Sequence, residues 1–434
     1  MLYYSTRDNN HTVSLKEAVL HGMPEEGGLY LPSRIPQIEK EFLENINSLN
    51  FREISFRLAQ LLLGEDVPDA VLREIITEAI NFDTPLVPIS HRINTLELFH
   101  GPTLAFKDVG ARFMARLMSY FISTSDKKLN ILVATSGDTG SAVANGFFKI
   151  PGINVFVLYP SGKISEIQEK QITTLGENII SVEVEGNFDD CQALVKRILS
   201  DASFTETLDI TTANSINIAR LIPQIFYYFR LFAQLEGYPQ SLSISVPSGN
   251  FGNLTAGLIA KKMGLPVYKF IAATNINDVF PEYLKTGVYR SRPSQSTISN
   301  AMDVGDPSNF IRIVNLYNGN LNILRKDLYG TSFTDEQTRE CIRNIYDTYN
   351  YICDPHGAVG FLGLEEYISK NPQIDKAVFL ETAHPAKFKN IVEPVIQKDI
   401  EIPHRLNKCL EKEKLSIRIS KNVDNLKDII IEKN

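Results

Sequence analysis

ILVATSGDTG, the sequence of residues 131–140, joins two kinds of segment. Its first four residues are a short, wholly apolar run, and the six that follow form a turn rich in glycine and hydroxyl groups. A stretch of small residues with helical spacing, 141–148, comes next. This order predicts a buried strand whose end carries the polar side chains of a ligand-binding turn.

The same pattern recurs along the chain and indicates an α/β fold. Further apolar runs lie at 155–158, 179–184, 244–246, 270–273 and 377–380, and helix-like stretches at 71–80, 189–199 and 254–263. Near-continuous apolar strands that alternate with helices are typical of open, mostly parallel sheets covered on both faces. The polar clusters come directly after the strands, where such sheets bind their ligands.

Length and composition limit the class of protein. A chain of 434 residues predicts two or three domains. The hydrophobic fraction of 43% and the charged fraction of 22% are those of a soluble globular protein. A net charge of −7 without a basic block argues against a nucleic-acid partner. No apolar run reaches the roughly 18 residues of a membrane span, and the first residues resemble no signal or transit peptide. We therefore expect a cytoplasmic protein with no membrane partner, whose charged last twenty or so residues are loosely held.

Neither a disulfide framework nor a metal site is expected. The four cysteines are far apart and form no CxxC pair. His356 and His384 have no partner at ligand spacing, so the sequence predicts that both are structural and that no metal is bound.

Residues 248–253, SGNFGN, lie between a predicted strand and a predicted helix. Glycines there allow backbone N–H groups to approach an anion, and a helix N-terminus adds partial positive charge. The loop lacks a Walker lysine and the dinucleotide glycine spacing, so it suits the phosphate of a small cofactor. The turn at 135–140 has the same design, and Ser136 and Thr139 add hydroxyl donors for a carboxylate. For each motif alone, an ordinary turn or a capped helix start remains an equal alternative.

A third segment, HGPTLAFKD at 100–108, places Lys107 before a helix with the apolar face Phe113, Leu117 and Phe121. Asp108 is predicted to cap this helix. Burial beside apolar neighbours and a positive helix end both disfavour an ammonium group, which makes Lys107 a candidate imine-forming amine. The alternative for any single lysine is a solvated surface charge.

These motifs together resemble the threonine synthase family. Residues 100–108 are similar to the HGPT-x-AFKD motif in which the family's lysine carries pyridoxal phosphate, and residues 135–140 and 248–252 resemble its TSGDTG and SGNFG loops. Four further segments match the family in the expected order: 27–32, 213–220, 300–303 and 382–388. The resemblance covers nearly the whole chain.

The resemblance implies the type-II pyridoxal-phosphate fold of the tryptophan synthase beta-like superfamily. Two open, mostly parallel α/β domains would hold the cofactor between them: 91–235, the smaller, and 236–434, the larger, after an N-terminal α/β region at 1–90. The implied reaction is a carbon–oxygen lyase step of threonine biosynthesis, which converts O-phospho-L-homoserine and water to L-threonine and phosphate. The implied cofactor is pyridoxal 5'-phosphate, and the chain would be a monomer or a homodimer.

The resemblance also implies the site residues. Cofactor binding falls to Lys107, also the catalytic residue, to Thr382 at the pyridine nitrogen, to Asp138, and to the phosphate loop residues Gly249, Asn250, Phe251, Gly252 and Asn253. Substrate binding falls to Ser136, Gly137 and Thr139 for the carboxylate and to Asn214, Ser215 and Arg220 for the phosphate. The planar guanidinium of Arg220 suits a phosphate, although a surface salt bridge is the alternative. Lys163 is an equally open candidate for extra charge or for a plain surface lysine.

Asp138 departs from the wider fold class, which often has asparagine beside the phenolic oxygen of the cofactor. A carboxylate beside a phenolate is repulsive unless the two share a proton or Asp138 turns away, and both alternatives stay open. Three rival functions share parts of the pattern: a serine or threonine dehydratase or cysteine synthase, a non-catalytic binding protein, and a nucleotide-binding protein.

Overall fold

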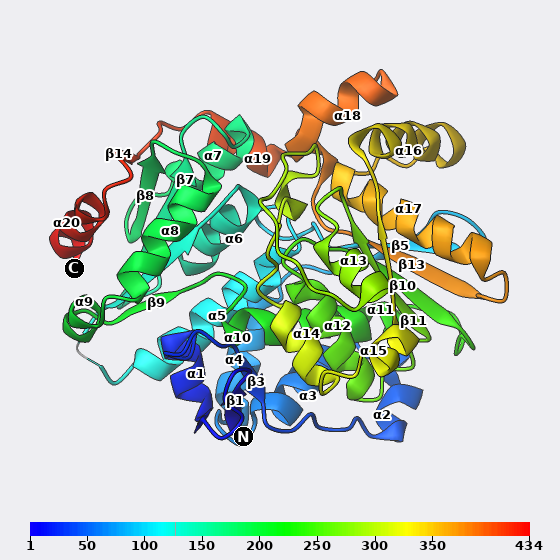
Figure 1. Cartoon of the computed structure of the whole chain (residues 1–434), viewed down its shortest axis with the longest axis horizontal. Helices are drawn as coiled ribbons and strands as arrows, with labels where there is room; N and C mark the ends of the chain where they lie inside the picture. The colour runs from blue at the N-terminus through cyan, green and yellow to red at the C-terminus, as the bar shows by residue number, and fades with distance from the viewer. Residues whose placement is uncertain (126) are drawn as a thin grey trace.

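The computed structural model describes residues 1–125 and 127–434. Two large sheets lie side by side, the smaller at the left of Figure 1 and the larger at the right. The smaller has five parallel strands in the order β14-β8-β7-β6-β9. Their bounds are β6 Leu129–Ala134, β7 Ile153–Pro160, β8 Ile179–Val184, β9 Ile210–Thr212 and β14 Ile417–Ile419.

The larger sheet has six strands in the order β12-β11-β10-β13-β5-β4. All its neighbours run parallel except β4, which is antiparallel to β5. Their bounds are β4 Leu86–Pro88, β5 Ile93–Glu97, β10 Leu242–Pro247, β11 Lys269–Thr274, β12 Leu328–Ser332 and β13 Lys376–Glu381. The central strand β10 is buried along its whole length, as expected for a parallel strand covered on both faces.

The N-terminal region adds a small antiparallel sheet, β2-β1-β3, with four α-helices and one 3-10 helix, and lies at the blue end of the colour scale in Figure 1. Its elements are β1 Tyr3–Ser5, β2 Thr12–Val13, β3 Tyr30–Pro32, α1 Leu15–His21, α2 Lys40–Glu44, η1 Ile46–Ser48, α3 Phe51–Leu63 and α4 Asp69–Ala79. The apolar faces of α3 and α4 join the main core, which also takes in α5 and one face of each large sheet.

Helices cover both large sheets. In the part of the chain before β10 they are α5 Lys107–Ile122, α6 Asp138–Phe147, α7 Glu166–Thr173, α8 Phe188–Leu199, α9 Ala202–Thr207, α10 Ile218–Leu221, η2 Ile222–Gln224 and α11 Ile225–Ala233. After β10 they are α12 Gly252–Lys262, α13 Val279–Thr286, η3 Asn300–Met302, α14 Phe310–Leu316, α15 Leu321–Asp327, α16 Asp335–Tyr349, α17 Pro355–Lys370, η4 Pro385–Phe388, α18 Lys389–Ile396, α19 His404–Leu410 and α20 Val423–Lys433. No helix in the ranges described is long and apolar enough to cross a membrane.

The strands expected from apolar runs are all present, as β6, β7, β8, β10, β11 and β13. The expected helices are present as α4, α6, α8 and α12. The missed strands are short or polar and lie mostly toward the sheet edges. For example, β5 reads INTLE and β12 reads LYGTS, so neither has the apolar run that marks a buried strand.

The chain interleaves the two sheets. Strands β4 and β5 come early in the sequence yet complete the larger sheet, whereas β14 comes near the end and extends the smaller one. Helix α20, red in Figure 1, packs on the smaller sheet and buries Leu426, Ile429 and Ile430. The expectation of a loosely held C-terminal end was therefore wrong, because its charges lie on one face of an amphipathic helix. The domain ranges 1–90, 91–235 and 236–434 remain a proposal.

A fully buried arginine joins the N-terminal region to the rest. Arg312 on α14 donates hydrogen bonds to the carbonyl oxygens of Tyr30, at 3.0 Å, and Ile216, at 2.6 Å. It also donates to the Ser215 carbonyl and to the Asn309 side chain. Burial lowers the pKa of Arg312 to about 9. This one side chain therefore fixes β3 against the loop that enters α10.

We expect Arg312→Met to destabilise the protein by about 3 kcal/mol or more, because several buried carbonyl groups lose their donor at about 1–3 kcal/mol each. Thermal and urea unfolding measure the loss. Arg290→Met, at an exposed arginine, is the matched control and should unfold like the unmodified chain. Equal stability of the two variants would contradict this role of Arg312.

Candidate active site

Lys107 is the first residue of α5, directly after a tight turn. The helix begins without a side-chain cap, and Asp108 instead accepts hydrogen bonds from the backbone N–H and the hydroxyl of Thr103, at 2.9 and 2.5 Å. The prediction that Asp108 caps the helix was therefore wrong, since the helix begins at Lys107 and Asp108 lies inside its first turn. Its carboxylate fixes the preceding turn and so fixes the direction in which Lys107 leaves it.

The amine of Lys107 lies in protein surroundings that disfavour its charge. Burial lowers its pKa to about 8; Asp138 opposes the shift, and the cations Lys387 and Arg220 add to it. The residue still keeps part of its surface accessible. Lys107 is thus not a solvated surface lysine, and a large share of it is the neutral, nucleophilic amine near pH 8.

Backbone hydrogen bonds tie the lysine turn to the end of β13. Phe106 N donates to Thr382 O at 2.9 Å, and His384 N donates to Leu104 O at 3.1 Å. Ala105 and Ala383 form an antiparallel bridge between these bonds. The pairing brings Lys107 and the buried Thr382, which are far apart in the sequence, to one place.

The loop at 248–253 forms an anion cradle at the start of α12. None of the backbone N–H groups of residues 249–253 donates to another protein group within the described ranges. Phe251 adopts a left-handed conformation, φ 56°, that turns the chain into the helix. A Cβ on Gly249 would lie 2.7 Å from Met302 Cα, so only glycine fits there. Free N–H groups at a helix N-terminus suit a phosphate.

Asn253 has a mainly structural side chain within this loop. Its amide donates to Pro247 O at 2.9 Å, and its oxygen accepts from the Ser248 hydroxyl at 2.8 Å. Asn253 would therefore bind a phosphate through its backbone N–H group.

The turn at 135–140 is organised by the buried Thr135. Its hydroxyl oxygen accepts hydrogen bonds from Gly137 N, at 2.9 Å, and Gly140 N, at 2.8 Å. Gly137 has φ 141°, and a Cβ there would lie 2.5 Å from the Gln168 side chain. Ser136 and Thr139 stay partly exposed, which is what a carboxylate site requires.

Asp138, the first residue of α6, is paired with a lysine that the sequence reading did not single out. Lys387 Nζ lies 2.5 Å from Asp138 Oδ1, and Gln168 donates to the same oxygen at 2.9 Å. Although burial alone would raise the pKa of Asp138, the lysines hold it well below its usual range. Asp138 is therefore an ionised carboxylate with a counter-charge. Lys387 could have been suspected only from its place in the matching segment 382–388.

The segment predicted to bind a substrate phosphate lies beside the cradle. Asn250 donates to Ser215 Oγ at 2.5 Å, and a Cβ on Gly252 would lie 3.7 Å from Ser215 Cβ. The amide of Asn214 bonds both backbone groups of Ala134, which ties this segment to the end of β6. A phosphate role for Asn214 stays a prediction beside that structural one.

Arg220 is buried, so the alternative of a surface salt bridge was wrong. Its Nη1 donates to Ala213 O at 2.6 Å, its Nε has no hydrogen-bond partner, and no carboxylate pairs with it in the described part of the chain. Burial lowers its pKa to about 10. A buried guanidinium without a protein anion is a ready binding site for an oxyanion.

These groups fit pyridoxal phosphate. Lys107 offers an amine, residues 249–253 offer free N–H donors for a phosphate, and Thr382 offers a neutral hydroxyl. No cluster of metal-ligand side chains is found in the ranges described. His356 and His384 have structural partners: Ala301 N donates to His356 Nε2, and Ala386 N donates to His384 Nδ1.

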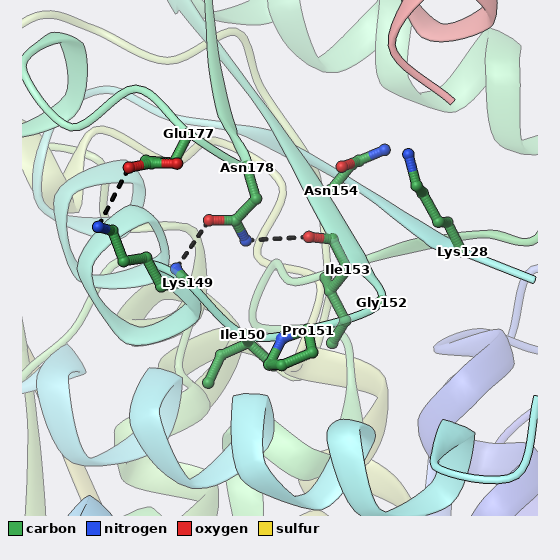
Figure 2. A pocket seen from close by; sticks show the side chains of 9 residues that line it. All are labelled: Lys128, Lys149, Ile150, Pro151, Gly152, Ile153, Asn154, Glu177 and Asn178. Atoms are coloured by element: carbon green, nitrogen blue, oxygen red, sulfur yellow. Dashed lines mark hydrogen bonds and ion pairs between the residues drawn. The ribbon is translucent and has the colours of Figure 1, made fainter.

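A hollow of about 300 Å³ lies elsewhere, around the turn that enters β7. Figure 2 shows Lys149 paired with Glu177 across it and Asn178 bonding the turn backbone. It contains none of the predicted site residues, and we assign it no role. Lys163 is exposed on a turn after β7. Both alternatives, extra charge for the substrate phosphate or a plain surface lysine, stay open for it.

Comparisons with known proteins agree with this geometry. A family model described as pyridoxal-phosphate dependent enzyme matches residues 80–382. Models for the threonine synthase N terminus and the threonine synthase C-terminal part match 2–80 and 357–430. A threonine synthase of Buchnera aphidicola is 42% identical, with 100% of both chains covered.

Two solved structures are similar over the whole chain. The crystal structure of threonine synthase from Escherichia coli has a TM-score of 0.92 and 40% identity, with 100% of both chains covered. The structure of threonine synthase with bound pyridoxal phosphate from Brucella melitensis has a TM-score of 0.92 and 31% identity, with 100% of this chain and 99% of that chain covered.

Fold, site and family model together define a pyridoxal-phosphate-dependent enzyme of fold type II. The N-terminal, central and C-terminal parts of the chain all match models of this enzyme family. These matches exclude the dehydratase, cysteine synthase, non-catalytic and nucleotide-binding alternatives. The chain belongs to the threonine synthase family, whose members are lyases of threonine biosynthesis.

We expect Gly249→Ala to weaken pyridoxal phosphate binding about tenfold or more, because the new methyl group overlaps the 301–302 backbone and must displace the loop. Overpacking of about 1–3 kcal/mol corresponds to this factor. Fluorescence titration of the cofactor-free protein measures it, together with the melting temperature. Unchanged affinity in a folded variant would place the cofactor phosphate elsewhere.

Proposed function

We propose that the chain converts O-phospho-L-homoserine and water to L-threonine and phosphate, with Lys107 as the catalytic residue. The observation that carries this proposal is the amine of Lys107, with its pKa near 8, under the influence of the buried Arg220, whose Nε has no partner. The free N–H cradle lies beside the same segment, since Asn250 contacts Ser215. One amine and two anion sites match a cofactor with one phosphate and a substrate with another.

Binding of the two phosphates is divided between two segments. The cradle formed by Gly249, Asn250, Phe251, Gly252 and Asn253 would hold the cofactor phosphate through backbone N–H groups. Arg220, with Ser215 and Asn214 beside it, would hold the substrate phosphate. Residues 136–139 would hold the substrate carboxylate through hydroxyl and backbone donors.

When bound, pyridoxal phosphate supplies an electron sink that acidifies the substrate carbons attached to it. Lys107 would hold the cofactor covalently through Nζ before substrate binds, and the freed amine would then carry protons. It would remove the α proton and then serve the β carbon, so that phosphate can leave from the γ carbon. Because its pKa lies near 8, a larger fraction of Lys107 than of an ordinary lysine is the neutral amine that can accept such protons.

Thr382 would meet the pyridine nitrogen with a hydroxyl. A hydroxyl carries no charge and so leaves that nitrogen largely unprotonated, which limits the charge that the ring accepts. The burial of Thr382 excludes water from this contact. We also propose that the protein is cytoplasmic and acts as a monomer or a homodimer on its small-molecule substrate.

Lys107→Ala should abolish both turnover and the visible absorbance of the purified protein, because the cofactor loses its covalent attachment and the substrate loses its base. Phosphate release and an absorbance spectrum measure the two effects. Lys149→Ala, at a surface lysine paired with Glu177, is the matched control and should keep both. Retained turnover in Lys107→Ala would refute the assignment.

Arg220→Ala should raise the KM for O-phospho-L-homoserine about 30-fold or more, since a charge-assisted contact contributes about 2 kcal/mol. The affinity for pyridoxal phosphate should change little. Arg230→Ala, which removes a surface pair with Asp83, serves as control. An equal loss of cofactor and substrate affinity would show that Arg220 belongs to the cofactor site.

A further inference from the structure

The ion pair between Asp138 and Lys387 joins the two sheets at the site. Asp138 begins α6, which follows strand β6 of the smaller sheet, whereas Lys387 lies in η4, which follows strand β13 of the larger sheet. The Lys387 side chain is fully buried and the Asp138 side chain is 4% exposed, so water screens their attraction little. Lys387 Nζ also donates to Thr103 O at 3.0 Å, in the turn that leads to Lys107.

One buried carboxylate therefore interacts with two lysines, Lys387 through a direct ion pair and Lys107 through the electrostatic attraction that also lowers the pKa of Asp138. A carboxylate in such surroundings needs a cationic partner, and removal of one partner leaves an uncompensated buried charge. Lys387 supplies that partner through a direct contact. Were Lys387 absent, Lys107 would be the cation left to compensate Asp138, and an ammonium group cannot attack an aldehyde or accept a proton.

We infer that Lys387 is a positioning residue that neutralises Asp138 and thereby increases the fraction of Lys107 that is an uncharged amine, free to react. The inference rests on the proposed function of Lys107. A carboxylate is tolerated at position 138 because Lys387 balances its charge and the amide of Gln168 donates a hydrogen bond to it.

The charges that act on Lys107 come from four segments. Asp138 on α6 and Asp354 before α17 favour its ammonium form. Lys387 in η4 and Arg220 on α10 disfavour it. Removal of Lys387 therefore favours the ammonium form of Lys107 in two ways: a repelling cation is lost, and Asp138 is left to attract the positive charge of Lys107. Removal of the Asp138 charge acts in the opposite direction.

The test uses the full chain, freed of cofactor and then mixed with pyridoxal phosphate at a series of pH values. The rate at which the visible absorbance of the lysine-bound cofactor appears measures the neutral fraction of Lys107. Borohydride reduction and peptide mass mapping confirm which lysine has reacted. In the unmodified chain we expect the rate to rise with pH through a midpoint of about 8.

Lys387→Met should move this midpoint upward by about one pH unit or more, which is about a tenfold slower reaction at neutral pH. Lys387→Arg keeps the charge and should stay near the unmodified midpoint. Asp138→Asn should move the midpoint downward, and the double variant Asp138→Asn with Lys387→Met should lie between the two single variants. Lys389→Met is the matched control, since Lys389 is two residues away and pairs with Glu393 on its own helix.

A merely structural role would lower the melting temperature of Lys387→Met without moving the midpoint, and the double variant would not restore it. Either result would overturn the inference. If Lys387→Met does not fold, an unchanged midpoint in Asp138→Asn overturns it equally. Failure of the unmodified chain to trap the cofactor on Lys107 would instead refute the proposed function, so the two failures are distinguishable.

Discussion

The site depends on the backbone pairing between residues 104–106 and 382–384. This short antiparallel contact attaches the turn before α5 to the end of β13, so the lysine is held by the larger sheet although its helix packs beside the smaller one. Most residues of this contact are buried, with Phe106 and His384 partly buried, and a buried N–H or C=O without a partner is costly. The position of Lys107 relative to Thr382 is therefore fixed by main-chain geometry.

The charged side chains around this contact are largely shielded from water. Lys107, Lys387, Arg220 and Asp138 are all largely enclosed, and of the three basic side chains Lys387 makes the ion pair with the carboxylate. The surplus of basic side chains over carboxylates favours the binding of anions. Arg312 is also buried, and in the described part of the chain it bonds to neutral oxygens. It therefore holds the loop before α10, which contains Ser215 and Ile216, without competing for an anion.

Much of this could be predicted from the sequence, because its strongest patterns are local. Apolar runs followed by glycine-rich turns predicted the central strands and both anion loops, and the flanks of Lys107 identified the lysine. The edge strands β9 and β14 were not predicted, because each has three residues and no apolar run. The pairing of Asp138 with Lys387 could not be predicted, because the two residues are far apart in the sequence and no rule of sequence spacing connects them. Asp108 was misplaced since an aspartate beside a helix start can cap the helix or brace the turn before it, and only the fold decides between these.

The interleaved sheets have a consequence for how the chain is made. Strand β5 is synthesised soon after its antiparallel neighbour β4, but its parallel neighbour β13 follows much later. The smaller sheet likewise gains β14 and α20 long after its other strands. Neither sheet can therefore acquire its full set of strands until the segments of β13 and β14 have been synthesised. Premature termination would leave an unpaired edge on β8, with Ile419 and the apolar face of α20 missing from its cover. Such an exposed edge promotes aggregation, so chains that lack β14 and α20 are expected to aggregate more readily than the full chain.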